Sequence, residues 1–238
     1  MAGRYAEAIP VVKTRLLRDP QFVSVYRELA TAYLGQWAAQ LSQDPETLAQ
    51  ALAAVQRAIG ILATASDNHS ALGYVYLWQQ QYEPALAAME RAIALEPNEA
   101  RNAVSNYAGL AEVLSRMGRA EEALGAAEQA LCLKPTTAGV DAHLASVGTA
   151  YAVAGRPEQA LAPLQRFLSR YPNRLTAHLT LAAVYSELGR EAEARAEAAE
   201  VLRLNPNFSL EVHKQRMPIK NPAALERHIA ALRKAGLK

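Results

Sequence analysis

Apolar residues recur along most of this chain at intervals of three and four positions, the spacing of amphipathic α-helices. The helical segments are of two kinds, which alternate. The first kind places a large apolar residue beside a small one, with Tyr or Leu three positions further on, as in Leu72, Gly73 and Tyr76. The second kind is eighteen residues long, with Ala twelve positions and Leu or Ile four positions before a closing proline. The pattern predicts pairs of helices repeated along the chain.

The second kind of segment recurs at nearly constant intervals. Five copies end in proline, at residues 3–20, 80–97, 118–135, 155–172 and 189–206, and a sixth copy without the proline occupies 46–63. Gly118, Gly155 and Gly189 open three of the copies and predict the turn between the helices of a pair, because glycine readily adopts the left-handed conformation that ends helices. From residue 63 onward, successive closing positions lie 34 to 38 residues apart. We therefore predict an all-α solenoid in which each repeat packs only against its neighbours.

The repeat resembles the tetratricopeptide repeat, or TPR, whose helix pair carries the large–small pair, Tyr, two Ala positions and the terminal Pro at these places. The resemblance covers residues 3–206, although Arg15 and Phe167 stand where a small alanine is expected. It implies a right-handed α-solenoid of antiparallel helix pairs. We expect residues 3–20 to form the unpaired second helix of an incomplete repeat. Residues 22–206 should form five TPR-like repeats, and residues 207–238 a basic C-terminal capping segment.

An insertion interrupts the first complete repeat. The segment 33–50, between the two helices of the pair, is nine residues longer than in the other repeats, and the extra residues lie at about 35–45. We expect the first helix to continue through Trp37. Asp44 and Pro45 predict the start of the second helix, because an aspartate side chain caps free N–H groups and proline suits the first helical position.

The tail after Pro206 has a pattern of its own. It predicts a short helix near Ser209–Gln215 and a last helix that begins at Asn221 and Pro222 and ends at Gly236. From residue 205 onward seven Lys and Arg oppose two Glu, a formal charge of +5, whereas the rest of the chain has 18 basic and 21 acidic residues, or −3. A basic end can attract nucleic acid, an acidic membrane surface or an acidic partner. Apolar residues in both segments of the tail favour instead a cap with a solvated basic face; they are Phe208, Leu210, Leu225, Ile229 and Leu232.

The insertion and the tail together resemble a more specific group. A Trp-containing insertion that ends in Asp-Pro, and a close of the form NP-x-FSLE followed by P-x-K-x-PA-x-LER and LRKAGL, are similar to the C-terminal TPR region of bacterial proteins with class III adenylyl or guanylyl cyclase domains. The residues that carry this resemblance are 35–50 and 205–237. The catalytic domain of those proteins, with its metal-binding aspartates, has no counterpart here. The resemblance implies a regulatory or scaffolding module and no cyclase activity.

The first segment, residues 3–20, is expected to present an apolar face without a preceding helix to cover it. Its residues Tyr5, Ile9, Val12 and Leu16 share one side of the helix. Two interpretations are open. Either the chain is the downstream part of a longer protein, or this face associates with a second copy to give a homo-oligomer.

Motifs of catalysis, phosphate binding and metal binding do not occur in the sequence. Packing is expected for His69 and His178, and surface positions for His213 and His228. The lone Cys132 cannot form an internal disulfide and suits a reducing compartment. With no apolar run of 18 residues and no signal peptide, the chain is expected to be cytoplasmic, without membrane insertion. We therefore predict a protein that is not an enzyme and that uses no cofactor and no metal.

Function should then lie in a surface. In TPR proteins the first helix of each pair lines a concave groove that takes a peptide or a partner helix. By this resemblance, and by their spacing of four positions, the residues expected to face the groove are Arg27, Thr31, Ser70, Tyr74, Trp78, Ala108, Glu112, Arg116, Ala145, Thr149, Leu179 and Ala183. The aromatic residues and arginines among them are the usual anchors of interfaces.

The first hypothesis is therefore a protein-interaction scaffold with a protein or peptide partner. The second is the regulatory module of a nucleotide cyclase. The third, which the cap interpretation disfavours, is nucleic-acid binding through the tail. Chaperone-type TPR proteins bind a C-terminal carboxylate with Lys and Asn, and the residues Ser70, Tyr74, Ala108 and Glu112 at such places argue against that specificity.

Overall fold

A computed structural model describes residues 3–96, 100–133 and 141–238. Over these ranges the chain forms α-helices and one 3₁₀ turn and no strand, so the predicted all-α fold class is confirmed. The helices are α1 (Gly3–Arg18), α2 (Val23–Ala38), α3 (Thr47–Ile61), α4 (Ser66–Trp78), α5 (Tyr82–Leu95), α6 (Ala100–Met117), α7 (Ala120–Cys132), η1 (Asp141–His143), α8 (Leu144–Val153), α9 (Pro157–Arg170), α10 (Leu175–Glu187), α11 (Glu191–Leu204), α12 (Leu210–Arg216) and α13 (Pro222–Lys234). The closing prolines expected at 97 and 135 and the side chain of Tyr5 lie outside the described residues.

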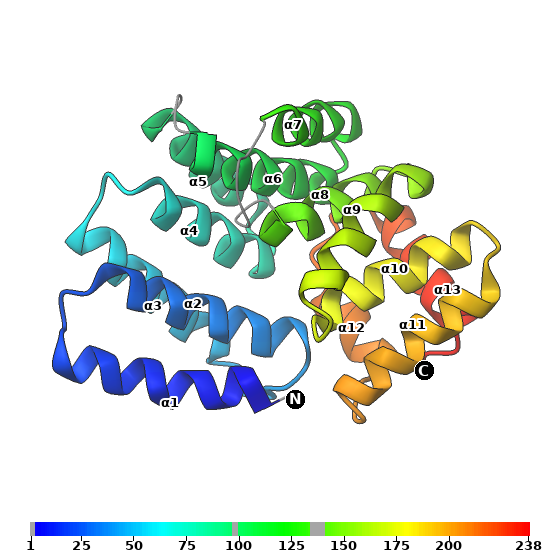
Figure 1. Ribbon diagram of the computed structural model, residues 1–238, viewed down its shortest axis with the longest axis horizontal. Coiled ribbons are helices and arrows are strands. Elements are labelled where there is room, and N and C mark those ends of the chain that lie inside the picture. The colour runs from blue at the N-terminus through cyan, green and yellow to red at the C-terminus, as the bar shows by residue number, and fades with distance from the viewer. Residues whose placement is uncertain (1–2, 97–99, 134–140) are drawn as a thin grey trace.

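Five helix pairs follow one another along a curved path: α2–α3, α4–α5, α6–α7, α8–α9 and α10–α11 (Figure 1). The first helix of each pair packs against the first helix of the next, and each second helix packs against its own partner and the following first helix. Small residues make this packing close. A methyl group built on Gly148 would lie 2.5 Å from the side chain of Leu164, and one on Gly73 would lie 2.8 Å from Met89. This is the solenoid that the repeat pattern predicts.

The same turn ends the first helix of every pair. The predicted turn glycines Gly118, Gly155 and Gly189 have φ values of +85°, +77° and +72°, in the left-handed region that glycine tolerates. In the first two pairs the corresponding residues are Gln40 and Gln80, with φ values of 56° and 60°. Left-handed glutamine is uncommon and indicates a local constraint.

The insertion in the first pair differs from expectation at one end. Helix α2 continues through Trp37 as predicted, but α3 begins at Thr47 and not at Pro45. The carboxylate of Asp44 accepts the N–H of Glu46 at 2.9 Å, and its carbonyl accepts the N–H of Thr47 at 3.1 Å. The aspartate therefore closes a turn ahead of the helix, which delays the helix start.

The tail forms both predicted helices. The side chain of Ser209 accepts the N–H of Val212 at the start of α12, and Asn221 accepts two N–H groups at the start of α13. Helix α13 packs against α10, with Ile229 and Leu232 almost fully buried. The tail also reaches back to the first pair, because the backbone N–H of Ser209 donates to the side chain of Gln40 at 3.0 Å. Just before the tail, Asn205 donates its side-chain N–H to the carbonyl of Ala39 at 2.9 Å. The tail is thus more than the terminal cap that we predicted: α12 lies on the inner side of the curve (Figure 1).

Helix α1 packs against α2 through part of the predicted apolar face. Val12 is buried and Ile9 and Leu16 are partly buried, in a cluster with α2 and α3. Val11 and Leu17 point away from that cluster and are 61% and 84% exposed. Among the described residues no helix combines the length and the apolar character needed to cross a bilayer.

Candidate functional site: the inner groove

The first helices of all five pairs line one groove on the inner side of the curve. The groove holds a cavity of about 620 Å³, a size typical of ligand sites. Ten of the twelve residues expected to face it do so: Arg27, Thr31, Ser70, Tyr74, Trp78, Glu112, Arg116, Ala145, Thr149 and Leu179. The other two, Ala108 and Ala183, are buried in the packing between helices. The four-residue spacing therefore identifies at least one residue of the groove on each of the five first helices, and ten of its thirty described lining residues in all.

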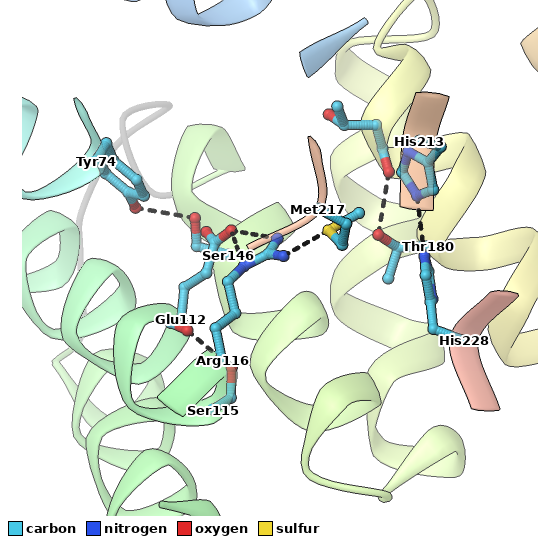
Figure 2. Close-up of polar contacts among 10 residues, drawn as sticks. Tyr74, Glu112, Ser115, Arg116, Ser146, Thr180, His213, Met217 and His228 are labelled. Carbon is cyan, nitrogen blue, oxygen red and sulfur yellow. Dashed lines mark hydrogen bonds and ion pairs between the residues drawn. The ribbon is translucent and has the colours of Figure 1, made fainter. Parts of the chain in front are cut away.

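A buried ion pair forms the floor of the groove. The guanidinium of Arg116 donates to the carboxylate of Glu112 at 2.8 Å and 3.1 Å, one helical turn away on α6. Its remaining amino group contacts the sulfur of Met217 at 2.8 Å (Figure 2). Because both charged side chains are buried, each depends on the other for compensation of its lost hydration.

Tyr74 links two repeats across the groove. Its hydroxyl lies 3.0 Å from the hydroxyl of Ser146, which joins α4 to α8. Burial, and then the charge of Glu112, raise the pKa of Tyr74 well above its usual value. The phenol is therefore neutral and serves as a hydrogen-bonding group of the wall (Figure 2).

The charges that line the groove are balanced. Arg27 lies 3.3 Å from Asp67 on the wall formed by α2 and α4, and Arg116 pairs with Glu112 on the floor. Burial lowers the pKa of His143, which favours its neutral form. Between these groups the walls are largely apolar, with side chains that include Leu34, Ala38, Ala71, Ala145 and Leu179. The groove suits a ligand with little net charge.

The tail contributes residues to the groove that the repeat pattern did not identify. His213 and Met217 line the cavity from the side opposite α4. The prediction that His213 and His228 lie at the surface is wrong for His213, which is 3% exposed, while His228 is half-buried. Their Nε2 atoms are 3.2 Å apart, and the ring of Phe208 lies 5.6 Å from that of His213. The physical reason is that α12 turns inward onto the solenoid, so its histidine faces α13.

Burial lowers the pKa of both histidines, that of His228 to about 4, with further contributions from Arg116 to each. Both rings are therefore neutral at neutral pH, and one can donate to the other. Over the part of the chain that the structure describes, no group of three or more His, Cys, Asp or Glu side chains could hold a metal ion.

Comparison with known proteins identifies the repeat. Models of the tetratricopeptide repeat family match residues 66–99 and residues 152–214. These ranges include the second pair of helices and the last repeat with the beginning of the tail. No curated protein matches the chain.

Solved structures share the fold. A chain of the APC/C hetero-tetramer Cut9–Hcn1 aligns with a TM-score of 0.61 and 18% identity, over 90% of this chain. This chain spans only 40% of the length of that one. A thermophilic TPR protein of Thermus thermophilus aligns with a TM-score of 0.53 and 23% identity, over 78% of this chain and 91% of the other. PilF of Pseudomonas aeruginosa aligns with a TM-score of 0.52 and 19% identity, over 92% and 90% of the two chains.

The chain therefore contains TPR repeats and has the TPR solenoid fold. At these identities the structural likeness establishes the fold alone. The predicted resemblance to cyclase-associated TPR regions gains no support from these relatives.

Proposed function

We propose that this chain is a non-catalytic interaction scaffold that binds a peptide or helix of a partner protein in the inner groove. One observation carries the proposal. Side chains from five successive repeats, chosen from the sequence by helical spacing, line a single cavity of about 620 Å³. A TPR fold supports protein–protein interaction in general, and a groove of this size supplies the surface for it.

The partner segment is expected to carry little charge and several apolar side chains. The ion pair Arg116–Glu112 leaves no excess charge of either sign on the floor of the groove, and Arg27–Asp67 leaves none on the wall formed by α2 and α4. Tyr74 and Trp78 provide aromatic surface of the kind that anchors interfaces. A strongly acidic or basic segment would lose hydration in this groove without gaining an opposite charge.

The basic tail offers little support for nucleic-acid binding. Four of its seven cations form ion pairs within the chain: Lys214 with Glu226 at 2.6 Å, Lys220 with Glu83 at 2.7 Å, Arg227 with Glu187 at 3.2 Å and Lys234 with Glu191 at 3.5 Å. Contacts with phosphates would have to break these pairs. The role as regulatory module of a cyclase stays a prediction, and it would use the same groove.

Selection of ligands from a phage library of random dodecapeptides against the full chain tests the proposal. Selected peptides are synthesised and titrated against Thr31→Arg and Thr176→Arg, which place a charge on exposed positions of opposite walls. The matched control is Gln129→Arg, on the exposed side of α7. We expect both groove variants to weaken binding at least about tenfold and the control to leave it unchanged. Equal affinity for all variants, or a selection that yields no binding peptide, would overturn the proposal.

A further inference from the structure

The turns that end α2 and α4 differ in residue type from the other three turns but not in geometry. In all five turns the left-handed residue donates its N–H to the carbonyl three positions earlier, and the next residue donates to the carbonyl five positions earlier. Three turns have glycine in the left-handed position, whereas Gln40 and Gln80 occupy it in the first two. A side chain in that conformation is unfavourable, so its presence points to a role for the side chain itself.

Both glutamine side chains bind the tail. Gln40 forms two hydrogen bonds to the backbone of Ser209: its Nε2 donates to the carbonyl at 2.9 Å, and its Oε1 accepts the N–H at 3.0 Å. Gln80 donates from Nε2 to the carbonyl of Gln215 at 3.2 Å. The two glutamines thus bind the beginning and the end of α12, about 170 and 135 positions further along the chain. Two unfavourable turns therefore bind the same element of the tail, which indicates a site built for that element.

Further contacts hold the residues at the end of α12. The guanidinium of Arg216 stacks on the ring of Trp37 at 3.8 Å and donates to the carbonyls of Trp37 and Ser42, each at 3.0 Å. Stacking on an aromatic face together with hydrogen bonds in the plane uses all the recognition features of a guanidinium group.

The extended stretch after α12 crosses the floor of the groove. Met217 contacts the guanidinium of Arg116 (Figure 2). The backbone N–H of Lys220 donates to the carbonyl of Arg116 at 2.8 Å. The side chains of Met217 and Ile219 are buried. The contact is nevertheless incompletely packed, because a cavity of about 360 Å³ remains between the two tryptophans, Trp37 and Trp78, and the residues of α12.

We propose that Trp37, Gln40, Gln80 and Arg116 form a second binding site, the tail site, for a short helix that continues into an extended Arg-Met-Pro-Ile-Lys stretch. The chain's own residues 209–220 occupy it as an intramolecular ligand that can be released. Release uncovers Arg116 and widens the inner groove, because Met217 contacts Arg116 in the tail site and also lines the inner groove. Only this effect on the groove rests on the proposed function; the tail site itself does not.

Hydrogen exchange of the full chain tests the occupancy. In the double variant Gln40→Gly and Gln80→Gly, each turn receives the residue that the other three turns use, so the turns lose their strain but also their contacts with the tail. We expect the amides of 210–220 to exchange at least about tenfold faster, with no change in the outer helices α7 and α9. The variant Gln40→Asn and Gln80→Asn keeps an amide in a residue that tolerates this conformation but is too short to reach, and it should behave likewise. Unchanged or slower exchange of the tail in both variants would overturn the proposal.

Binding of a tail peptide in trans tests the site directly. A fluorescent peptide with the sequence of residues 208–221 is titrated against the wild-type chain and against Arg216→Ala, which weakens the resident tail and leaves the tail site intact. We expect at least about tenfold tighter binding to Arg216→Ala, and loss of that binding when Gln40→Gly and Gln80→Gly are added. Equal binding to all three proteins, or none to any, contradicts the proposal. Neither experiment uses a ligand of the groove, so the result is separable from that of the phage selection.

Discussion

Arg116 is the residue that joins the groove to the tail. Its guanidinium contacts Glu112 and Met217, and its carbonyl accepts the N–H of Lys220. A buried arginine with these partners is stable only while they remain, because the cost of burying its charge is large. The structure of the groove floor therefore depends on the side chain of Arg116 and on the carboxylate of Glu112 that pairs with it.

Replacement of that carboxylate should be costly. We expect Glu112→Ala to lower the free energy of unfolding by about 3 kcal/mol, because it leaves the buried guanidinium of Arg116 without an opposite charge. Urea denaturation measures the change. The control is Glu28→Ala, which breaks the exposed pair with Arg15 and should cost at most about 1 kcal/mol. Similar losses in the two variants would show that the floor pair has no special role.

Two glycines make a second test. Gly148→Ala forces a methyl group to 2.5 Å from Leu164 and 3.3 Å from the carbonyl of Ala160, and we expect a loss of roughly 1–3 kcal/mol. Gly125→Ala adds the same methyl group to the exposed side of α7, where nothing lies within 4 Å. There the lower backbone entropy of the unfolded chain should stabilise the protein by about 0.5–1 kcal/mol. Thermal unfolding midpoints that move in the same direction would refute the account of helix packing.

The residues predicted from the sequence and those that were missed differ in one physical respect. Thr31, Tyr74 and Arg116 occupy recurring positions on the first helices of their pairs, so local periodicity identifies them. Gln40 and Met217 act through contacts with segments more than 100 positions away, which no local pattern encodes. One signal was present: glutamine at positions 40 and 80, where other repeats have glycine, marks turns that serve a second purpose.

At the scale of elements, the contact between α12 and α13 is sensitive to acid. His213 and His228 face each other across it. The pKa of His213 is lowered by burial, then by His228 and by Arg116 on α6, and the pKa of His228 is lowered by burial, then by Arg116 and Arg227. In the unfolded chain a histidine has a pKa of about 6.5. The folded state therefore binds fewer protons, and its stability is complete above about pH 6.5 and falls as the pH decreases towards 4.

This linkage gives a prediction for urea midpoints at pH 7.5 and pH 5. The wild-type chain should lose stability over this range, and His228→Gln should lose less, because it removes one of the histidines that take up a proton on unfolding. Burial disfavours the charge on His178, but its hydrogen bond with Glu197 carries its pKa above the usual value, so it titrates with the opposite sign. That effect is common to both proteins and cancels. An identical pH dependence in wild type and variant would contradict the assignment.

The element boundaries show where local signals suffice. Ser209 and Asn221 begin α12 and α13 as predicted, because a cap depends on residues within one helical turn. Asp44 misled the prediction of α3, since the same side chain can close a turn as readily as it caps a helix. The inward direction of α12 could not be predicted, because it depends on the distant partners Gln40 and Trp37.

At the scale of the whole molecule, the sequence predicts a solenoid because each repeat contacts its neighbours through the same places. The tail adds contacts that join the first complete pair to the last, from Ala39 and Gln40 to Asn205 and Ser209. These contacts connect the two ends of the curved row of helix pairs (Figure 1). The basic tail thus lies on the more acidic remainder of the chain, which is consistent with their opposite formal charges.

The most direct test of the central claim is hydrogen exchange of the full chain with and without a peptide selected from the random library. We predict protection in the first helices of the pairs, α2, α4, α6, α8 and α10, and none in the outer helices α3, α5, α7 and α9 beyond their turns. Protection confined to the outer helices, or a bound peptide that protects no inner helix, would contradict an inner groove that binds a partner.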